Sequence, residues 1–82
     1  MRDYTEREKR VLLAGVVGGH ERDSVWSRFP DAIATLSDRG LVRMGSELLA
    51  NGTVSSFPLC LSPIGVLEAR RLQEIVQMSS LL

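Results

Sequence analysis

The chain of 82 residues has little of what builds a disulfide or zinc site, since it contains one cysteine, Cys60, and one histidine, His20. A single cysteine cannot form an internal disulfide, and the pair cannot supply the three or four Cys/His ligands of a zinc site. Small secreted domains are usually held together by disulfides. Because this chain cannot form an internal one, a reducing, cytoplasmic location is expected.

Long apolar runs and an excess of charge are also missing. The longest apolar run, residues 11–19, includes its glycines and is about half the length needed to span a bilayer. Acidic residues precede it and no small-residue cleavage site follows, so neither a signal peptide nor membrane association is predicted. Ten basic and ten acidic residues cancel, which leaves no overall charge to attract nucleic acid.

The length allows one small domain, expected to span residues 1–82 with a core from about residue 5 to residue 77. His20, Asp23 and Ser24 contain the residue types of a catalytic triad, but neighbours in one short segment cannot surround a substrate. Phosphate-loop glycines followed by Lys-Ser/Thr are absent from the sequence. No catalytic residue, metal ligand or cofactor is therefore predicted, and a binding role is expected instead of an enzymatic one.

Helix signals are clear in the first half of the chain. Thr5 and Glu8 have the spacing of a capping box, which predicts a helix over residues 6–17 that buries Leu12, Leu13 and Val16 and ends at two glycines. Asp23 is expected to cap a second helix over residues 24–29. Its apolar residues Val25, Trp26 and Phe29 fill the core in one interpretation, whereas Trp26 is an exposed binding anchor in the other.

A third helix is predicted from Pro30 to about Arg39, because proline suits the first helical position. It should bury Ile33 and Leu36. Gly40 is expected to adopt the left-handed conformation after the helix, with Leu41 closing back on Leu36.

Asn51-Gly52 predicts a β-hairpin with a two-residue type I′ turn. With the turn centred there, Val42 faces Leu61, Arg43 faces Cys60 and Met44 faces Leu59. The same register pairs Ser46 with Phe57, Leu49 with Val54, and Ala50 with Thr53. Pro58 then falls opposite Gly45, where it fits best at an edge or a bulge.

Ser62-Pro63 predicts the start of a last helix, extending from Ile64 to about Gln77. Its apolar residues are expected to point inward, namely Ile64, Leu67, Leu72, Ile75 and Val76. Arg70 and Arg71 are expected on a solvated face, paired with Glu68 and Glu74. The tail, residues 78–82, is expected to fray unless its leucines dock.

Three helices, a hairpin and a helix are the order of a winged helix-turn-helix domain, an α+β fold that is mostly α. Two segments, Leu36–Val42 and Leu59–Gly65, resemble repressors of the multiple-antibiotic-resistance type. The resemblance covers roughly residues 6–77. It implies a third helix in the DNA major groove with a wing on the adjacent backbone, and dimerisation through the terminal helices. Carried over by position, the groove-facing residues are Asp31, Ala34, Thr35 and Asp38, with Ser27 and Arg28 just ahead of them.

Charge along the chain points to a different partner. Residues 20–56, which would face DNA, carry four arginines against five acidic residues, and no basic residue occurs between Arg43 and Arg70. Binding to DNA scales with the phosphates that basic residues neutralise, so recognition of a protein is favoured over recognition of DNA. The favoured contacts combine an apolar wing tip with a polar third helix: Leu48, Leu49, Val54, Asp31, Thr35 and Asp38.

Two functional hypotheses follow. The favoured one is a small adaptor, inhibitor or regulatory subunit, a class that includes the compact inhibitors made by phages. The alternative is a homodimeric DNA-binding regulator that uses Arg28, Thr35, Arg39 and Arg43. Two interpretations of Leu48 and Leu49 at the hairpin tip also stay open. They either fold back onto a neighbouring helix or project as an apolar patch that needs a partner.

Overall fold

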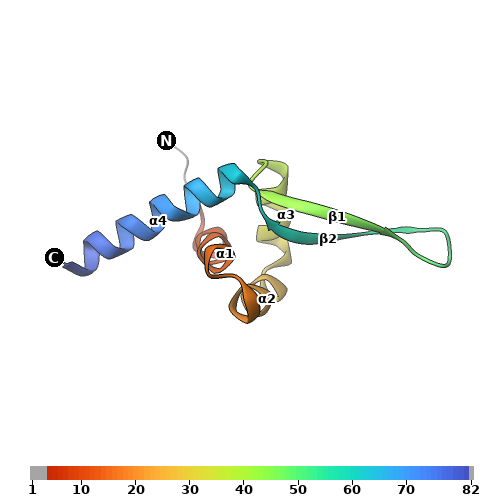
Figure 1. The fold of residues 1–82 in the computed structure, drawn as a ribbon, viewed down its shortest axis with the longest axis horizontal. Helices are drawn as coiled ribbons and strands as arrows, with labels where there is room; N and C mark the ends of the chain where they lie inside the picture. The colour runs from red at the N-terminus through yellow and green to blue at the C-terminus, as the bar shows by residue number, and fades with distance from the viewer. Residues whose placement is uncertain (1–3, 82) are drawn as a thin grey trace.

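The computed structural model describes residues 4–81, and it describes the side chains of residues 4–75. The fold is mixed α+β and mostly helical, with a two-stranded antiparallel sheet, and the element order expected from the sequence is confirmed (Figure 1). The elements are α1 (Glu6–Val17), α2 (Gly19–Arg28), α3 (Pro30–Asp38), β1 (Val42–Leu48), β2 (Val54–Leu61) and α4 (Pro63–Leu81).

α1 begins where the capping box predicts. The Thr5 hydroxyl accepts the Glu8 amide hydrogen at 3.2 Å, and the Glu8 carboxylate accepts the Thr5 amide hydrogen at 2.9 Å. The buried face differs from the expected one, because Val11 and Ala14 join Leu12 in the core while Leu13 and Val16 are only half-buried. The buried face is therefore turned by about one residue around the helix from the predicted one, and α2, α3 and α4 all contact α1.

α2 is longer than predicted, and the proposed cap at Asp23 is wrong. Gly18 and Gly19 both have positive φ, 75° and 58°, a region open to glycine. The chain therefore reverses direction at once, and Gly18 ends α1 as it begins α2. Asp23 lies inside the helix. Trp26 is buried, and its indole N–H donates to the Val11 carbonyl at 2.8 Å, which confirms the core interpretation.

The end of α3 matches the expected cap. Gly40 has a φ of 77°. Its amide donates to the Ser37 carbonyl at 3.0 Å, and the Leu41 amide donates to the Leu36 carbonyl at 2.9 Å. These two bonds satisfy carbonyls that the helix leaves open, in the arrangement of a Schellman motif. Leu36 and Leu41 are both fully buried, so the first strand leaves α3 from a fixed position.

The hairpin register is right at the base and wrong toward the tip. Val42 pairs with Leu61 and Arg43 with Cys60, as expected, but Met44 pairs with Pro58 and not with Leu59. The extra residue in β2 is a β-bulge at Leu59. Beyond it the remaining pairs are displaced by one residue from the predicted register: Gly45–Phe57, Ser46–Ser56, Glu47–Ser55 and Leu48–Val54.

The turn explains this displacement, because it connects the strands through three residues and not two. The Leu49 amide donates to the Thr53 carbonyl at 2.8 Å, and the Gly52 amide donates to the Leu49 carbonyl at 3.0 Å. Among the described residues only glycines have positive φ, so Asn51 is not in the type I′ conformation. Its side-chain oxygen instead accepts the Thr53 amide hydrogen at 3.1 Å. The bulge then restores the expected register where Val42 and Leu61 enter the core.

α4 presents a different face to the body from the one predicted. Ile64, Leu67 and Ile75 are exposed by 52, 63 and 59 %, so the expectation that they point inward is wrong. The inner face is formed by Gly65, Glu68, Ala69 and the half-buried Leu72. Small residues are needed there because α4 crosses closely over α1 and Leu41.

The backbone of α4 continues to Leu81, where fraying was expected after Gln77. The side chains of Val76, which was expected to point inward, and of the tail leucines Leu81 and Leu82 lie outside the described ones.

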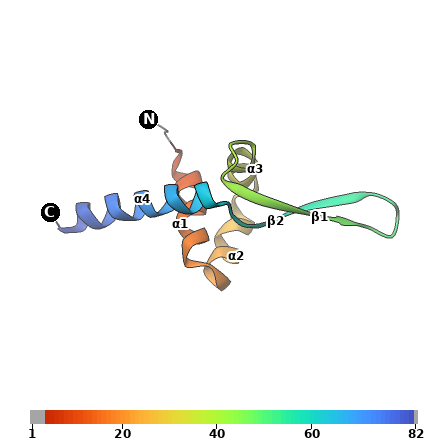
Figure 2. The ribbon, with the colours of Figure 1, turned by 45° about the horizontal axis from the view of Figure 1, so that its top comes forward.

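The molecule is extended. The hairpin projects from one side of the three-helix body and the distal half of α4 projects from the other (Figures 1 and 2). The radius of gyration is 14.0 Å, against about 11.7 Å for a compact chain of this length. In the part of the chain that the structure describes, no helix has both the length and the apolar character required to cross a bilayer.

Candidate protein-binding surface

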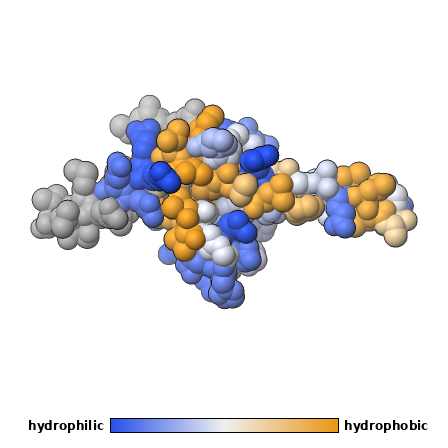
Figure 3. Space-filling view, in the orientation of Figure 1, coloured by the Kyte–Doolittle hydropathy of each residue, from blue (hydrophilic) through white to orange (hydrophobic). Residues whose placement is uncertain are grey.

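The hairpin tip, defined here as Leu48, Leu49 and Val54, projects from the body as an apolar patch. Leu48 is 73 % exposed, Val54 65 % and Leu49 41 %. Leu48 and Val54 are directly paired, so they lie side by side on one face of the hairpin. Figure 3 shows this apolar surface at the far end of the hairpin, separated from the body by a more polar section. The leucines therefore do not fold back onto a helix of their own chain.

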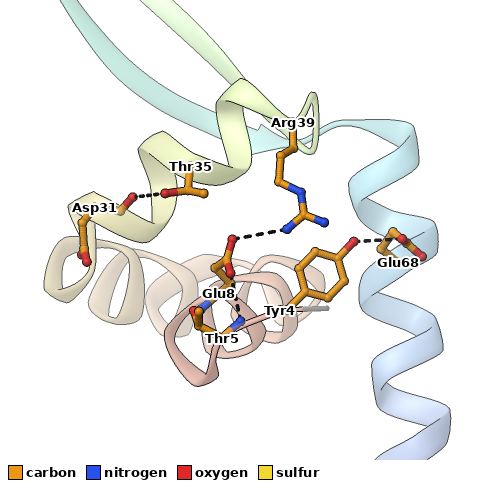
Figure 4. Close-up of polar contacts among 7 residues, drawn as sticks. All are labelled: Tyr4, Thr5, Glu8, Asp31, Thr35, Arg39 and Glu68. Carbon is orange, nitrogen blue, oxygen red and sulfur yellow. Dashed lines mark hydrogen bonds and ion pairs between the residues drawn. The ribbon is translucent and has the colours of Figure 1, made fainter. Parts of the chain in front are cut away.

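The acidic face of α3, defined as Asp31, Thr35 and Asp38, is exposed along its length. Two of its three side chains have partners within the chain. Arg7 donates to the Asp31 carboxylate at 3.0 Å. The Thr35 hydroxyl donates to the Asp31 carbonyl at 3.0 Å (Figure 4). The hydrogen bond from Arg7 is the main reason that the pKa of Asp31 lies below its ordinary value.

Asp38 stands in the last turn of α3, which contains no basic residue. The C-terminus of a helix carries partial negative charge, so an acidic side chain there is unfavourable by roughly 0.3–1 kcal/mol. Residues that break a local rule of this kind are often found at functional positions. A cation from a partner would relieve the repulsion.

A groove of about 500 Å³ lies between the helices and the hairpin. The apolar part of its wall comes from Trp26, Pro30, Ile33, Ala34, Met44 and Pro58. The hairpin residues in this wall belong to the face that carries Leu48 and Val54, because strand residues separated by an even number share a face. Sequence reasoning did not find this groove, since it depends on which face of the hairpin turns toward α2 and α3.

The residues implied for DNA binding lie on three elements. Arg28 ends α2 and lines a shallow hollow between α1 and α2. Arg43 lies at the base of β1, opposite Cys60, and Thr35 is on the acidic face of α3. Arg28 and Arg43 form no ion pair with the described part of the chain. They are therefore the members of the set whose charge is open to an anionic partner.

Arg39 is held against the body. Its guanidinium lies 3.5 Å from the Glu8 carboxylate and 4.6 Å from the centre of the Tyr4 ring. The Tyr4 hydroxyl in turn donates to Glu68 at 2.8 Å, and Arg71 donates to the same carboxylate at 3.1 Å. Figure 4 shows Arg39, Tyr4 and Glu68 bridging from the end of α3 to α4. The Glu8 carboxylate therefore offsets the positive charge of Arg39, which would otherwise be available to attract a DNA phosphate.

This polar cluster was missed by the sequence analysis. Glu8 and Glu68 are buried, with 5 and 8 % exposure, whereas Glu68 was expected on a solvated face. The capping box gave a partial signal, because its acidic residue must turn back toward the helix start.

The two segments on which the family resemblance rests meet in space. The Ser62 amide donates to the Leu41 carbonyl at 2.9 Å, and the Ser62 hydroxyl donates to the Gly40 carbonyl at 2.7 Å. The same hydroxyl accepts the Gly65 amide hydrogen at 3.1 Å, as expected of an N-cap. These bonds join the end of α3 to the start of α4 and so fix the base of the hairpin.

His20 is exposed in the first turn of α2, and Cys60 is half-buried in β2.

Comparison with protein-family models, with curated protein sequences and with solved structures gives no match to this chain.

Proposed function

We propose that the chain is a winged-helix domain that acts by binding another protein, as a small adaptor, inhibitor or regulatory subunit, and that it is not an enzyme. The observation that carries this proposal is the exposure of the hairpin tip. Leu48 and Val54, 73 and 65 % exposed, lie together at the end of an arm that supports no core of its own. Apolar patches held away from the body are typical of protein interaction sites.

The acidic face of α3 is the second part of the proposed surface. Asp38 has an unfavourable position within its own helix, and a basic side chain of the partner would compensate for it. The proposed partner therefore presents an apolar contact together with a basic one. The proposed setting is the cytoplasm, which the single cysteine favours.

The alternative is a homodimeric regulator that binds DNA through Arg28, Thr35, Arg39 and Arg43. Arg28 and Arg43 are available for such a role. The proposal favours protein because no charged residue occurs from Leu48 to Leu67, so the hairpin tip offers no positive charge to a phosphate. In addition, the charge of Arg39 is offset by Glu8.

A titration with random-sequence duplex DNA at 50 and 200 mM salt separates the two functions. A protein that neutralises six or more phosphates loses about 10³-fold or more in affinity over this interval. We expect no binding at either salt concentration by fluorescence anisotropy. Tight binding at 50 mM salt that disappears at 200 mM would overturn the proposal in favour of the DNA-binding regulator.

Replacement of Leu48 and Leu49 by serine tests whether the tip is a surface or a part of the core. Removal of exposed apolar groups changes folding stability by about 0.5 kcal/mol or less, so the double variant should unfold at a temperature within a few degrees of the parent. Leu36→Ala, a truncation in the core, is the matched control and should cost about 2–5 kcal/mol. If the tip variant unfolds as readily as the core variant, the leucines are structural and the proposal fails.

A further inference from the structure

The face of the hairpin that turns toward α2 and α3 alternates between apolar and polar pairs. Starting from the body, the paired residues on this face are Met44–Pro58, then Ser46–Ser56, then Leu48–Val54. The first pair lines the groove, together with Ser56. The last pair is the exposed tip. The same face of the hairpin therefore has an apolar pair in the groove at one end and an apolar pair at the exposed tip at the other, with two small serines between them.

A pattern of this kind is complementary to itself. A two-fold axis requires the same patch on both partners: if one residue contacts a second residue of the partner, the second contacts the first in return, and only residues on the axis meet their own counterparts. If two hairpins lie face to face and antiparallel, with the axis at the serine pair, Leu48 and Val54 of each chain reach the Met44–Pro58 level of the other. The serines meet at the axis, where small side chains let the ribbons approach closely.

We propose that the groove takes the hairpin tip of a second copy of this chain, so that two copies form a dimer by reciprocal insertion. The inference rests on the proposed function, because it assigns a partner to the same apolar tip. Each groove exposes Pro30, Ala34 and Met44 to the incoming side chains, and the nearly buried Trp26 and Ile33 complete its lining. Its volume of about 500 Å³ lies within the range of sites that enclose small ligands.

The surface area of the monomer agrees with this arrangement. The accessible surface is 5878 Å², whereas a compact protein of 9.1 kDa exposes only about 4,900 Å². The excess, about 1,000 Å², is comparable to the roughly 800 Å² that each partner contributes to an interface of standard size. The hairpin is one of the two parts that project from the body (Figure 1).

Charge does not oppose the contact. The tip belongs to the uncharged segment Leu48–Leu67. At the groove Arg22 is already paired with Asp23 at 3.5 Å, and its guanidinium lies 5.7 Å from the centre of the Trp26 ring. An uncharged tip can therefore enter without leaving a new unpaired charge. The acidic face of α3 lies beside the groove and contributes no lining residue to it, so a dimer would display two copies of that face.

Sedimentation equilibrium over a range of about 1 µM to 1 mM tests the proposal on the full chain. We expect the parent protein to form a dimer. The tip variant Leu48→Ser/Val54→Ser and the groove variant Ala34→Arg should each weaken dimerisation by about 100-fold or more. Ala34 is exposed, and an arginine there can pair with Asp31 or Asp38 on the same helix, so α3 should remain stable. Circular dichroism verifies the fold of each variant.

Two matched controls identify the interface. Ser55→Thr alters the opposite face of the hairpin and should leave dimerisation unchanged. Leu67→Ser removes an exposed leucine from α4, through which the sequence analysis allowed a dimer. Loss of the dimer in Leu67→Ser, with a normal dimer in the tip variant, would overturn the proposal in favour of α4.

Chemical crosslinking tests the position of the axis. In a Cys60→Ser background, Ser46→Cys should give a covalent dimer with a short bis-maleimide, because position 46 meets its counterpart across the axis. Glu47→Cys places the thiol on the other face of the same strand and should not. Equal crosslinking at both positions would contradict the arrangement.

A parent protein that is monomeric at 1 mM would overturn self-association. It would leave the proposed function standing, because that function is tested by the duplex titration and by the folding of Leu48→Ser/Leu49→Ser. Conversely, salt-dependent DNA binding by a hairpin-mediated dimer would overturn the proposed function alone.

Discussion

Gly65 is the residue at which α4 packs against the backbone of Leu41, and Gly65→Ala tests that close approach directly. A β-carbon at position 65 would overlap the Leu41 carbonyl oxygen and lie 3.0 Å from the carbonyl carbon. This oxygen accepts the Ser62 amide hydrogen. The substitution therefore forces a methyl group against a carbonyl group that already accepts a hydrogen bond. Gly65 is itself buried.

Two effects of opposite sign compete in this variant. Alanine is favoured over glycine inside a helix by about 1 kcal/mol. Forcing a methyl group into a packed site costs about 1–3 kcal/mol, and displacement of the Leu41 carbonyl weakens a hydrogen bond that contributes about 1 kcal/mol. The steric effect wins in this balance, and we expect a net destabilisation of about 1–3 kcal/mol. For a domain of this size the melting temperature should fall by roughly 5–20 °C.

Urea denaturation followed by circular dichroism at 222 nm gives the free energy of unfolding. Gly15→Ala is the comparison, because the nearest atoms to its added β-carbon belong to the Leu61 side chain, with Cγ at 2.6 Å. A side chain can rotate away more easily than a carbonyl group can move, so this variant should lose less stability than Gly65→Ala. If Gly65→Ala is as stable as the parent protein or more stable, the close approach of α4 to Leu41 is refuted.

Three further outcomes are expected. Gly40→Ala should lower the free energy of unfolding by about 1–2 kcal/mol in the same urea assay, because Gly40 has a φ of 77° with open space around it; an unchanged value would mean that the left-handed cap is not needed. Thr5→Ala should lower it by about 0.5–2 kcal/mol through loss of the capping box, whereas Thr5→Ser should retain most of the stability. In an NMR titration the pKa of Asp31 should lie below that of an ordinary aspartate and should rise in Arg7→Gln. Because the folded pKa is lowered, the stability from this ion pair is present above the unfolded pKa and is lost as the pH falls through the folded one, and a pKa that does not change in Arg7→Gln would contradict the assignment.

The helix ends that could be predicted from the sequence are those determined by hydrogen bonds between neighbouring residues. Thr5 with Glu8 and Gly40 with Leu41 are short-range motifs whose hydrogen bonds close within a few residues, so no knowledge of the remaining chain was needed. The boundary at Asp23 failed for a related reason. An N-cap signal there was outweighed by Gly18 and Gly19, which allowed α2 to start five residues earlier.

Contacts between distant segments account for the errors in α4 and in the hairpin. Ile64 and Leu67 were assigned to the core by their apolar character, but the close approach of Leu41 selects Gly65 for the inner face instead. The bulge at Leu59 compensates for a three-residue turn, and that compensation is visible only when both ends of the hairpin are known.

The candidate surface was predicted in its parts and missed in its arrangement. The sequence identified Leu48, Leu49 and Val54 as an apolar tip, and the structure places them at the end of a projecting arm. It could not identify the groove, because Ile33 and Met44 become neighbours only through the packing of the hairpin beside α3. Whether the tip binds protein stays a prediction.

The bulge at Leu59 has a consequence for how this arm can change. Side chains along a strand alternate between two faces, so the single unpaired residue acts as a half-period phase shift between the base of β2 and its outer part. It keeps Val54 and Pro58 on the same side of the hairpin as Leu61, although Leu61 is an odd number of residues away from both. Deletion of Leu59 would remove the bulge and leave the pairs from Val42–Leu61 to Leu48–Val54 as they are. The arm can therefore gain or lose one residue at this point without changing the side on which it presents its apolar end.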